Sequence, residues 1–254
     1  MRILVTRPAN QAEEWAAELT RLGLDAVALP LIDIAAPLEP AAVRQAWVEL
    51  PSRQLIFFVS PNAVEWFFSA RPERMAWPPT LQVGSPGPGT SSVLRRCGVP
   101  SHLIVQPPFD AAQFDSEALW NELQRQRWSH ASVLVVRGDG GRDWLAEQLR
   151  AAGASVSFVS AYRRVEPRFS AVAHALLHAA LTAPEAHVWF FSSSEAVTNL
   201  THLREVQAGA VDWSRATALA THPRIAHSAQ AVGFGKVLSC RAALDAVAAR
   251  LFGM

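Results

Sequence analysis

A glycine-rich turn between a predicted strand and a predicted helix is the first feature whose residue types could do chemistry. The stretch VLVVRGDGGRDWLAEQL, residues 133–149, places Gly140, Gly141 and Arg142 just before the helical pattern. Exposed backbone N–H groups at a helix N-terminus attract anions, and an arginine adds positive charge. The pattern is neither G-x-G-x-x-G nor a P-loop, so it does not indicate a nucleotide. It is consistent with an anion site, but also with small residues that only close a tight turn.

Other predicted strands are followed by turns of similar composition. Ligands of open parallel sheets bind beyond the carboxyl ends of the strands, where such turns offer hydroxyl groups, backbone N–H groups and arginine. Any one of them can be an ordinary helix cap. Together they predict a site for a ligand with several negative charges. The turns are TRPAN (6–10), SPNA (60–63), VGSPGPGT (83–90), SSSEA (192–196) and THPRI (221–225).

Few residues are suited to acid–base or metal chemistry. Tyr162 is the single tyrosine, and Arg163 and Arg164 follow it. Its phenol is either a packing group of a strand or a proton donor at the wall of a cleft. The sequence has no G-x-S-x-G nucleophile elbow. His174 and His178 lie four residues apart without a third ligand nearby, so no metal site is expected.

The composition is that of an ordinary globular protein. The 254 residues are 50% hydrophobic and 18% charged, enough for one large domain or two smaller ones. A net charge of +1 gives no general attraction to nucleic acid or anionic membranes. Two cysteines are too few for a disulfide framework. Without a recognisable leader or a long apolar run, we expect a cytoplasmic protein, and nothing requires more than a monomer.

Predicted strands alternate with predicted helices along the whole chain. The helical stretches carry apolar residues at spacings of three and four, and the strands are short apolar runs. This alternation predicts an α/β protein with parallel sheets covered by helices on both faces. The predicted strands span 2–6, 25–34, 54–59, 80–84, 102–106, 131–137, 155–165, 187–192, 216–221 and 236–239.

The chain also repeats itself. ILVTR (3–7) matches VLVVR (133–137) at an offset of 130 residues, and FFVSPNAV (57–64) matches FFSSSEAV (190–197) at an offset of 133. Gly98 falls on Gly233 in a third, weaker match. These offsets predict a duplicated α/β unit and therefore two lobes. Two extended segments that close with proline, at 30–40 and 160–167, are interpreted as connections between the lobes.

In their order and spacing, these stretches resemble uroporphyrinogen-III synthase, especially its bacterial form. The resemblance covers nearly the whole chain. It implies two flavodoxin-like or Rossmann-like lobes of parallel sheet flanked by helices, joined by two crossing strands. We therefore expect a discontinuous domain 1 (1–32 and 166–254), a domain 2 (40–158) and linker strands at 33–39 and 159–165. The stretches are ILVTRP, LIFFVSPNAV, VGSPGPGT, SEALW, VLVVRGDGGRDWLAEQLRAAGA, AYRRVEP, FFSSSEAVTNL and THPRIAHSAQAVGF.

The resemblance also implies an activity, that of a hydro-lyase of haem biosynthesis. The family's substrate is hydroxymethylbilane, a linear tetrapyrrole with eight carboxylates. Its terminal hydroxyl leaves as water, and the ring closes with inversion of the last pyrrole ring to give uroporphyrinogen III. Neither a metal nor an organic cofactor takes part. A reaction of this kind depends on holding one conformation more than on strong nucleophiles.

By the same resemblance, Tyr162 is the group expected to assist departure of the hydroxyl. Two departures from the family pattern affect the binding turns. VGSPGPGT contains about three extra residues, Ser85 to Gly87, and THPRI replaces a glycine-threonine turn. The residues expected to bind substrate are Arg7, Ser60, Asn62, Thr90, Gly140, Gly141, Arg142, Ser193, Ser194 and Arg224.

Two other functions fit parts of the sequence. A two-lobed cytoplasmic binding or sensor module could close on an acidic small molecule without changing it, because one fold serves many functions. A nucleotide-using α/β enzyme is disfavoured, since the sequence lacks a phosphate-binding fingerprint.

Overall fold

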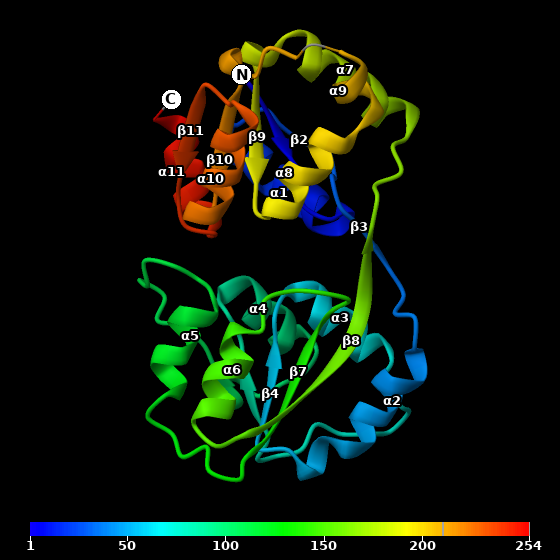
Figure 1. The fold of residues 1–254 in the computed structure, drawn as a ribbon, viewed down its shortest axis with the longest axis vertical. Helices are drawn as coiled ribbons and strands as arrows, with labels where there is room; N and C mark the ends of the chain where they lie inside the picture. The colour runs from blue at the N-terminus through cyan, green and yellow to red at the C-terminus, as the bar shows by residue number, and fades with distance from the viewer. Residues whose placement is uncertain (210, 254) are drawn as a thin grey trace. The chain divides into compact units, whose positions relative to one another are not determined.

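Two β-sheets, each covered by helices, make up the chain in the computed structural model, which describes residues 1–209 and 211–253 (Figure 1). This architecture confirms the predicted α/β class. The chain divides into unit 1, Met1–Asp33 with Val165–Met254, and unit 2, Ile34–Arg164. Each unit is described separately below.

Unit 1 contains a five-stranded parallel sheet in the order β11-β10-β9-β1-β2. Its strands are β1 (Arg2–Val5), β2 (Ala26–Ala28), β9 (His187–Phe191), β10 (Thr217–Ala220) and β11 (Lys236–Ser239). Its helices are α1 (Ala9–Arg21), α7 (Ala171–Thr182), α8 (Ser194–His202), α9 (Arg204–Ala208), α10 (Pro223–Val232) and α11 (Leu244–Phe252), with short 3-10 turns at Pro184–Ala186 and Trp213–Arg215.

The core of unit 1 follows from the alternation of side chains along its strands. Ile3 and Val5 point to one face with Phe190, where they pack against the buried residues of α1 and α11. Helices α8 and α10 contact each other as well as β9 and β10. The sheet is therefore covered on both faces, and its strand ends are the places where a ligand can reach it.

Unit 2 contains a six-stranded sheet in the order β3-β8-β7-β4-β5-β6, parallel from β8 to β6. Its strands are β3 (Asp33–Ala35), β4 (Leu55–Phe58), β5 (Gln82–Gly84), β6 (Ile104–Val105), β7 (Ser132–Gly138) and β8 (Ser155–Val165). Its helices are α2 (Pro40–Glu49), α3 (Pro61–Ser69), α4 (Pro88–Arg96), α5 (Ser116–Leu123) and α6 (Trp144–Ala151), with 3-10 turns at Leu50–Ser52 and Ser101–Leu103.

Alternate residues of the unit 2 strands enter two separate cores. Ile56 and Leu134 pack with α2, α3 and α4 on one face. Leu55 and Val133 pack with α5 and α6 on the other. This arrangement buries nearly every side chain of β4 and β7 and explains why their sequences are uniformly apolar.

The two units share one arrangement, although the chain passes through their strands in a different order. The offsets of 130 and 133 residues relate β1 to β7, β2 to β8 and β9 to β4. Equivalent strands are neighbours in both sheets, and their pairing register is the same. The matching pairs are Leu4 with Trp189, Leu134 with Ile56, Val5 with Phe190 and Val135 with Phe57.

Glycines at the ends of helices follow the same repeat. Gly23 after α1 and Gly153 after α6 have φ of 90° and 98°, and Gly98 after α4 and Gly233 after α10 have φ of 87° and 104°. Positive φ is costly for residues with a β-carbon, so glycine stops these helices. The repeat noticed in the sequence is therefore a repeat of local structure.

The structure corrects one predicted strand. The run 25–34 forms β2 and β3, which belong to different sheets. Pro30, which lies between them, lacks an N–H donor and interrupts the ladder. The expected linker segments 33–39 and 159–165 include β3 and the end of β8, which lie side by side in the six-stranded sheet.

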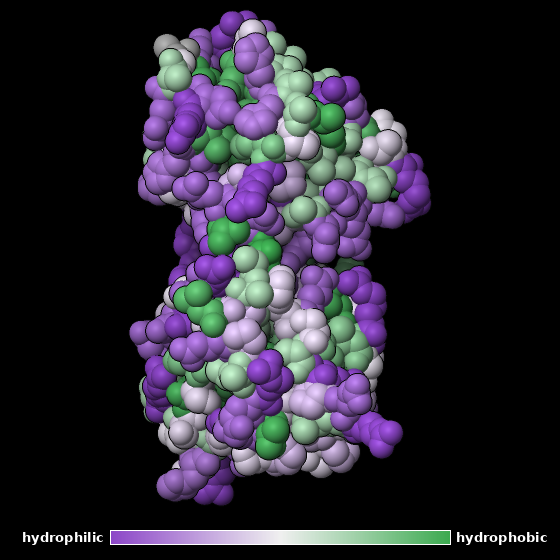
Figure 2. Space-filling view, turned by 90° about the vertical axis from the view of Figure 1, so that its right-hand side faces the viewer, coloured by the Kyte–Doolittle hydropathy of each residue, from purple (hydrophilic) through white to green (hydrophobic). Residues whose placement is uncertain are grey.

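The surface mixes hydrophilic and hydrophobic residues, as Figure 2 shows for one face. Scattered apolar side chains such as Leu38 and Val172 are 77% and 79% exposed, which is normal for a globular surface. Among the described residues, no helix is long and apolar enough to cross a membrane.

Candidate functional site

The predicted site residues of unit 2 lie at one edge of its sheet. Strands β5, β4, β7 and β8 are neighbours, and the parallel pairing brings their carboxyl ends to the same edge. The turns that leave this edge carry Ser60 and Asn62 after β4, Thr90 after β5, and the Gly140–Arg142 segment after β7. Tyr162 lies near the end of β8.

Tyr162 forms a short hydrogen-bonded chain with two of its neighbours. Its hydroxyl lies 3.2 Å from Ser60 Oγ and accepts a hydrogen bond from Arg164 Nη2, also 3.2 Å away. Ser60 in turn caps α3 by accepting the N–H of Ala63 at 3.2 Å. Tyr162 is 1% exposed, whereas Ser60 is half-buried. The structure thus joins the expected proton donor to one of the expected binding residues.

The position of the Tyr162 ring depends on an irregularity between β7 and β8. The register shifts between Arg137 and Gly138, so that Gly138 lies opposite Tyr162. A β-carbon added at Gly138 would be 2.9 Å from Cε2 of Tyr162. Only glycine leaves room for the ring here. The sequence showed the glycine but not the bulge, because its register depends on the partner strand.

The glycine-rich turn is accessible, but its arginine has a partner. Gly140 and Gly141 have no atoms within 4 Å of an added β-carbon, and Gly141 has a φ of 139°. Arg142 forms two hydrogen bonds with Glu117, at 2.5 and 2.9 Å, which raise the pKa of Arg142. Its charge is therefore shared with a carboxylate of the same unit.

The turn VGSPGPGT is mostly packed inside unit 2. Ser85 and Ser91 are fully buried; the Ser91 hydroxyl donates to Ser85 Oγ at 2.8 Å, and Ser85 Oγ donates to the Gly87 carbonyl at 2.9 Å. A β-carbon on Gly87 would lie 2.7 Å from Phe114. The extra residues Ser85 to Gly87 thus stabilise the turn. Thr90 is 4% exposed.

In unit 1, Arg7 at the end of β1 is a half-buried cation. Its guanidinium lies 4.6 Å from the centre of the Trp15 ring, and its Nε donates to Gln11 at 3.3 Å. Within the described residues Arg7 forms no ion pair with a carboxylate. Desolvation by burial lowers the pKa of Arg7 to about 10, partly opposed by the charge of Glu14. It remains protonated at neutral pH.

The repeat gives Arg7 an internal comparison. Its equivalent in unit 2, Arg137, forms an ion pair with Asp143 and stacks over Phe158. The two arginines thus share a place in the fold but differ in partner. An anion at the carboxyl edge of unit 1 would meet the guanidinium that lacks a carboxylate.

The remaining predicted residues of unit 1 follow β9 and β10, which are neighbours of β1 or of each other. Ser193 caps α8 by accepting the N–H of Glu195 at 3.2 Å, and Ser194 is the first residue of that helix. Arg224 is exposed, and its backbone N–H donates to Nδ1 of His222 at 3.1 Å. The predicted residues thus form two sets, one on each unit.

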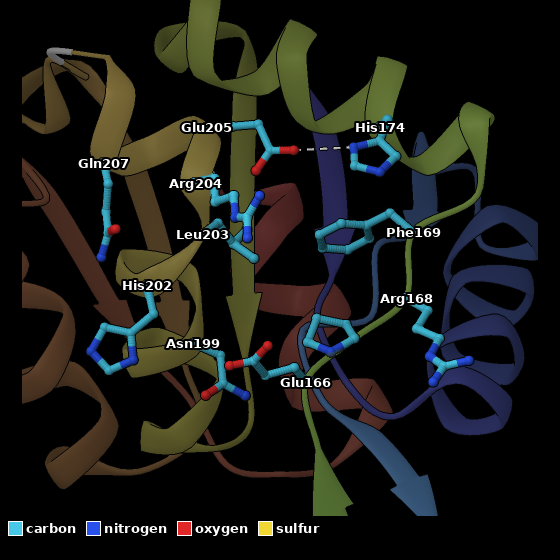
Figure 3. A pocket seen from close by; sticks show the side chains of 11 residues that line it. Glu166, Arg168, Phe169, His174, Asn199, His202, Leu203, Arg204, Glu205 and Gln207 are labelled. Atoms are coloured by element: carbon cyan, nitrogen blue, oxygen red, sulfur yellow. Dashed lines mark ion pairs between the residues drawn. The ribbon is translucent and has the colours of Figure 1, made fainter.

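Unit 1 also has a hollow of about 550 Å³ that the sequence did not indicate (Figure 3). It lies where the segment after β8 passes α7, α8 and α9, and its lining includes none of the predicted site residues. His174 faces Glu205 at 3.2 Å and lies edge-on to Phe169. The charges of Glu166, Arg168 and Arg204 also line it. Because its signs are mixed and its polar residues are exposed, it does not favour one charge of ligand.

Candidate metal ligands do not gather in the structure. Within residues 1–209 and 211–253, no group of three or more His, Cys, Asp or Glu side chains could hold a metal ion. His174 is paired with Glu205 instead of a second histidine.

Comparison with known proteins assigns the chain to a family. The family described as "Uroporphyrinogen-III synthase HemD" matches residues 13–249. The chain belongs to the uroporphyrinogen-III synthase family. Uroporphyrinogen-III synthase from Proteus mirabilis is 32% identical over 167 residues, 65% of this chain and 81% of that protein. The Salmonella typhimurium enzyme is 32% identical over 178 residues, 69% of this chain and 70% of that protein.

Solved structures of uroporphyrinogen-III synthases support the fold. A mutant of the Thermus thermophilus enzyme has a TM-score of 0.60 and 16% identity, covering 100% of this chain and 96% of that one. The Helicobacter pylori enzyme has a TM-score of 0.53 and 14% identity, covering 99% and 97%. At these identities the likeness concerns the fold alone. The resemblance seen in the sequence to this family is thus confirmed, together with its hydro-lyase activity in tetrapyrrole biosynthesis.

Proposed function

We propose that the substrate of this chain is hydroxymethylbilane and that the product is uroporphyrinogen III. The observation that carries the proposal is the contact of Tyr162 with Ser60 and Arg164 at the carboxyl edge of unit 2. It joins a phenol, a hydroxyl and a cation where ligands of parallel sheets bind. Membership of the uroporphyrinogen-III synthase family supports the same substrate.

In this proposal the two sets of turns hold the eight carboxylates of the substrate. Arg7 supplies a cation that has no carboxylate partner among the described residues, and the exposed backbone at Gly140 and Gly141 supplies N–H groups. Ser60, Asn62, Thr90, Arg142, Ser193, Ser194 and Arg224 complete the set of proposed contacts.

The chemical step needs little from the protein. The terminal hydroxyl leaves as water after protonation, and the neighbouring pyrrole nitrogen supplies electrons to form an azafulvene cation. A pyrrole carbon of the last ring then attacks this cation. The protein contributes a proton donor near Tyr162 and fixes the conformation in which the last ring is inverted.

The test is to incubate purified protein with freshly made hydroxymethylbilane, oxidise the products and separate the type I and type III isomers of uroporphyrin. Spontaneous closure gives type I, so the proposal expects a dominant type III peak. Type I alone, from folded protein that still binds substrate, would contradict it and favour a binding or sensor module.

The same proposal includes no metal or organic cofactor and a monomeric, cytoplasmic enzyme. Dialysis against EDTA should leave the rate of type III formation unchanged. A rate restored only by an added metal ion would oppose this part. Size-exclusion chromatography and cell fractionation test the oligomeric state and the location.

A further inference from the structure

We propose that Ser60 is the residue that gives the proton to the departing hydroxyl group, and that Tyr162 and Arg164 act through Ser60. The inference rests on the proposed function, because it concerns the same loss of water. It assigns Ser60 as the catalytic residue and the other two as positioning residues.

Exposure distinguishes the two hydroxyl groups. Tyr162 is 1% exposed and belongs to the core cluster of α2, α3 and α4, while Ser60 is half-buried at the start of α3. The packing of Gly138 against the ring leaves Tyr162 no room to shift toward β7. A substrate at this edge of the sheet therefore meets the serine hydroxyl first.

The direction of the hydrogen bonds follows from what each group can donate. A guanidinium only donates, so the Tyr162 oxygen accepts from Arg164, and Ser60 Oγ accepts from the N–H of Ala63. Within the described residues, Ser60 and Arg164 are the hydrogen-bond partners of the Tyr162 hydroxyl. If the phenol donates to Ser60, the serine proton is directed outward. The opposite direction would leave a buried phenolic proton without an acceptor, which is costly.

The proton transfer balances along this path. The C–O bond of the substrate breaks, its electron pair stays on oxygen, and the Ser60 proton converts the leaving group into water. The Tyr162 proton moves to Ser60 Oγ, and the phenolate keeps its hydrogen bond from Arg164. Ring closure later releases a proton from a pyrrole carbon. That proton returns through Ser60 to Tyr162, so the protein ends in its starting state.

The other unit shows that the serine turn alone does not make this path. Ser193 is the equivalent of Ser60 and also caps its helix. The position equivalent to Tyr162, at the offset of 130 residues, is Ile32, which is 3% exposed. Unit 1 therefore keeps the helix cap without a phenol. We assign proton transfer to the turn of unit 2 and only binding to that of unit 1.

A double-mutant cycle tests the path by the single-turnover rate of type III formation. Ser60→Ala and Tyr162→Phe should each slow the reaction by about 10- to 100-fold, toward the low end for a general acid because water can also supply a proton. The double variant should be no slower than the slower single variant, because both changes break one path. Ser60→Thr, which keeps the hydroxyl, should remain within about threefold of the unchanged protein.

The pH dependence separates proton transfer from a structural effect. The deficits of Ser60→Ala and Tyr162→Phe should shrink as pH falls, since solvent acid then replaces the missing donor. Arg164→Gln should slow the step without changing the inhibition constant of uroporphyrinogen III. Ser193→Ala should weaken binding and leave the shape of the pH profile as it is.

Two variants control for the lost helix cap. Ser170→Ala removes the same kind of cap from α7, whose hydroxyl accepts the Ala173 N–H at 3.2 Å, and reports its cost in stability. Ser60→Gly removes the hydroxyl and still permits a cap, so it serves if Ser60→Ala does not fold. Rate losses that multiply in the double variant would overturn the path, as would an undiminished rate in Ser60→Gly. Failure of the unchanged protein to make type III product would instead overturn the proposed function.

Discussion

Gly138 lies directly against the ring of Tyr162, although the two residues are on different strands. A β-carbon at position 138 would approach the Tyr162 Cε2 and Cζ atoms to 2.9 and 3.0 Å. Such distances force the ring or the strand to move. The space that the tyrosine occupies thus depends on a residue that has no side chain.

Gly138→Ala should therefore lower both stability and activity. We expect a loss of about 1–3 kcal/mol in the free energy of unfolding, as for other overpacked cores. The displaced ring should also lengthen the contact with Ser60 and slow formation of type III product. Gly89→Ala is the matched control for stability, because an added β-carbon there meets nothing within 4 Å. An active, fully stable Gly138→Ala protein would contradict the packing argument.

Arg7 and Arg137 should respond differently to loss of charge. Arg7→Gln should weaken substrate binding by about tenfold, which is the size of a charge-assisted hydrogen bond. Because burial has lowered the pKa of Arg7 to about 10, its protonated form destabilises the folded state at neutral pH. Arg7→Met should therefore stabilise the protein by about 1 kcal/mol while weakening binding.

Arg137→Gln is the comparison, since it leaves Asp143 without its ion-pair partner. It should cost stability and change substrate affinity less than Arg7→Gln does. Inhibition by uroporphyrinogen III and urea denaturation measure the two effects. Equal losses of affinity in the two variants would show that the missing carboxylate partner of Arg7 has no bearing on binding.

Glu117 should compete with the substrate for Arg142. Its two hydrogen bonds to Arg142 occupy the guanidinium that the glycine-rich turn offers. Glu117→Gln should lower KM by about threefold, because an exposed ion pair contributes at most about 1 kcal/mol. Arg142→Gln should raise KM, and the double variant should resemble Arg142→Gln. An unchanged KM in Glu117→Gln would remove Arg142 from the binding set.

The extra residues of VGSPGPGT should matter for stability. Ser85→Ala removes the acceptor of the buried Ser91 hydroxyl and the donor to the Gly87 carbonyl. We expect a loss of about 1–3 kcal/mol, the cost of unsatisfied buried polar groups. The ratio of type III to type I product should stay the same, as measured after complete turnover. A changed ratio would mean that the turn also shapes the substrate site.

Cys240 should react slowly with alkylating reagents. Desolvation raises its pKa from the ordinary value of 9.0 to about 11, so the thiolate at pH 8 is about one hundredfold scarcer. Iodoacetamide should modify it correspondingly slowly in a Cys97→Ala protein, as followed by mass spectrometry. Between pH 9 and 11 the unfolded thiol ionises before the folded one. The protein should therefore lose more stability over this range than Cys240→Ala does.

Much of the fold could be predicted because apolar runs and helical spacings are local properties. The offset between ILVTR and VLVVR even contained the shared pairing register, since residues at matched positions pair alike in both sheets. The division of 25–34 into β2 and β3 could not be seen. Residues on both sides of Pro30 are apolar, and their assignment to different sheets depends on distant partners.

The candidate site was predicted in its residue types more than in its contacts. Ser60 and Tyr162 were both named, but 102 residues separate them, and their contact arises from the order of β4, β7 and β8. The partner of Arg142 was missed because nothing in SEALW marks Glu117 as near the turn. Roles that depend on a neighbour far along the chain need the structure.

The neighbouring positions of β3 and β8 have a consequence for how the chain folds during synthesis. Unit 1 cannot complete its sheet until β9 has been made, and 131 residues of unit 2 separate its two parts. Closing a loop of that length costs about 2 kcal/mol more than closing one of about ten residues. Once unit 2 has folded, β3 and β8 hold the two exit points of the chain side by side. The inserted unit then acts as a template that shortens the search of the unit that surrounds it.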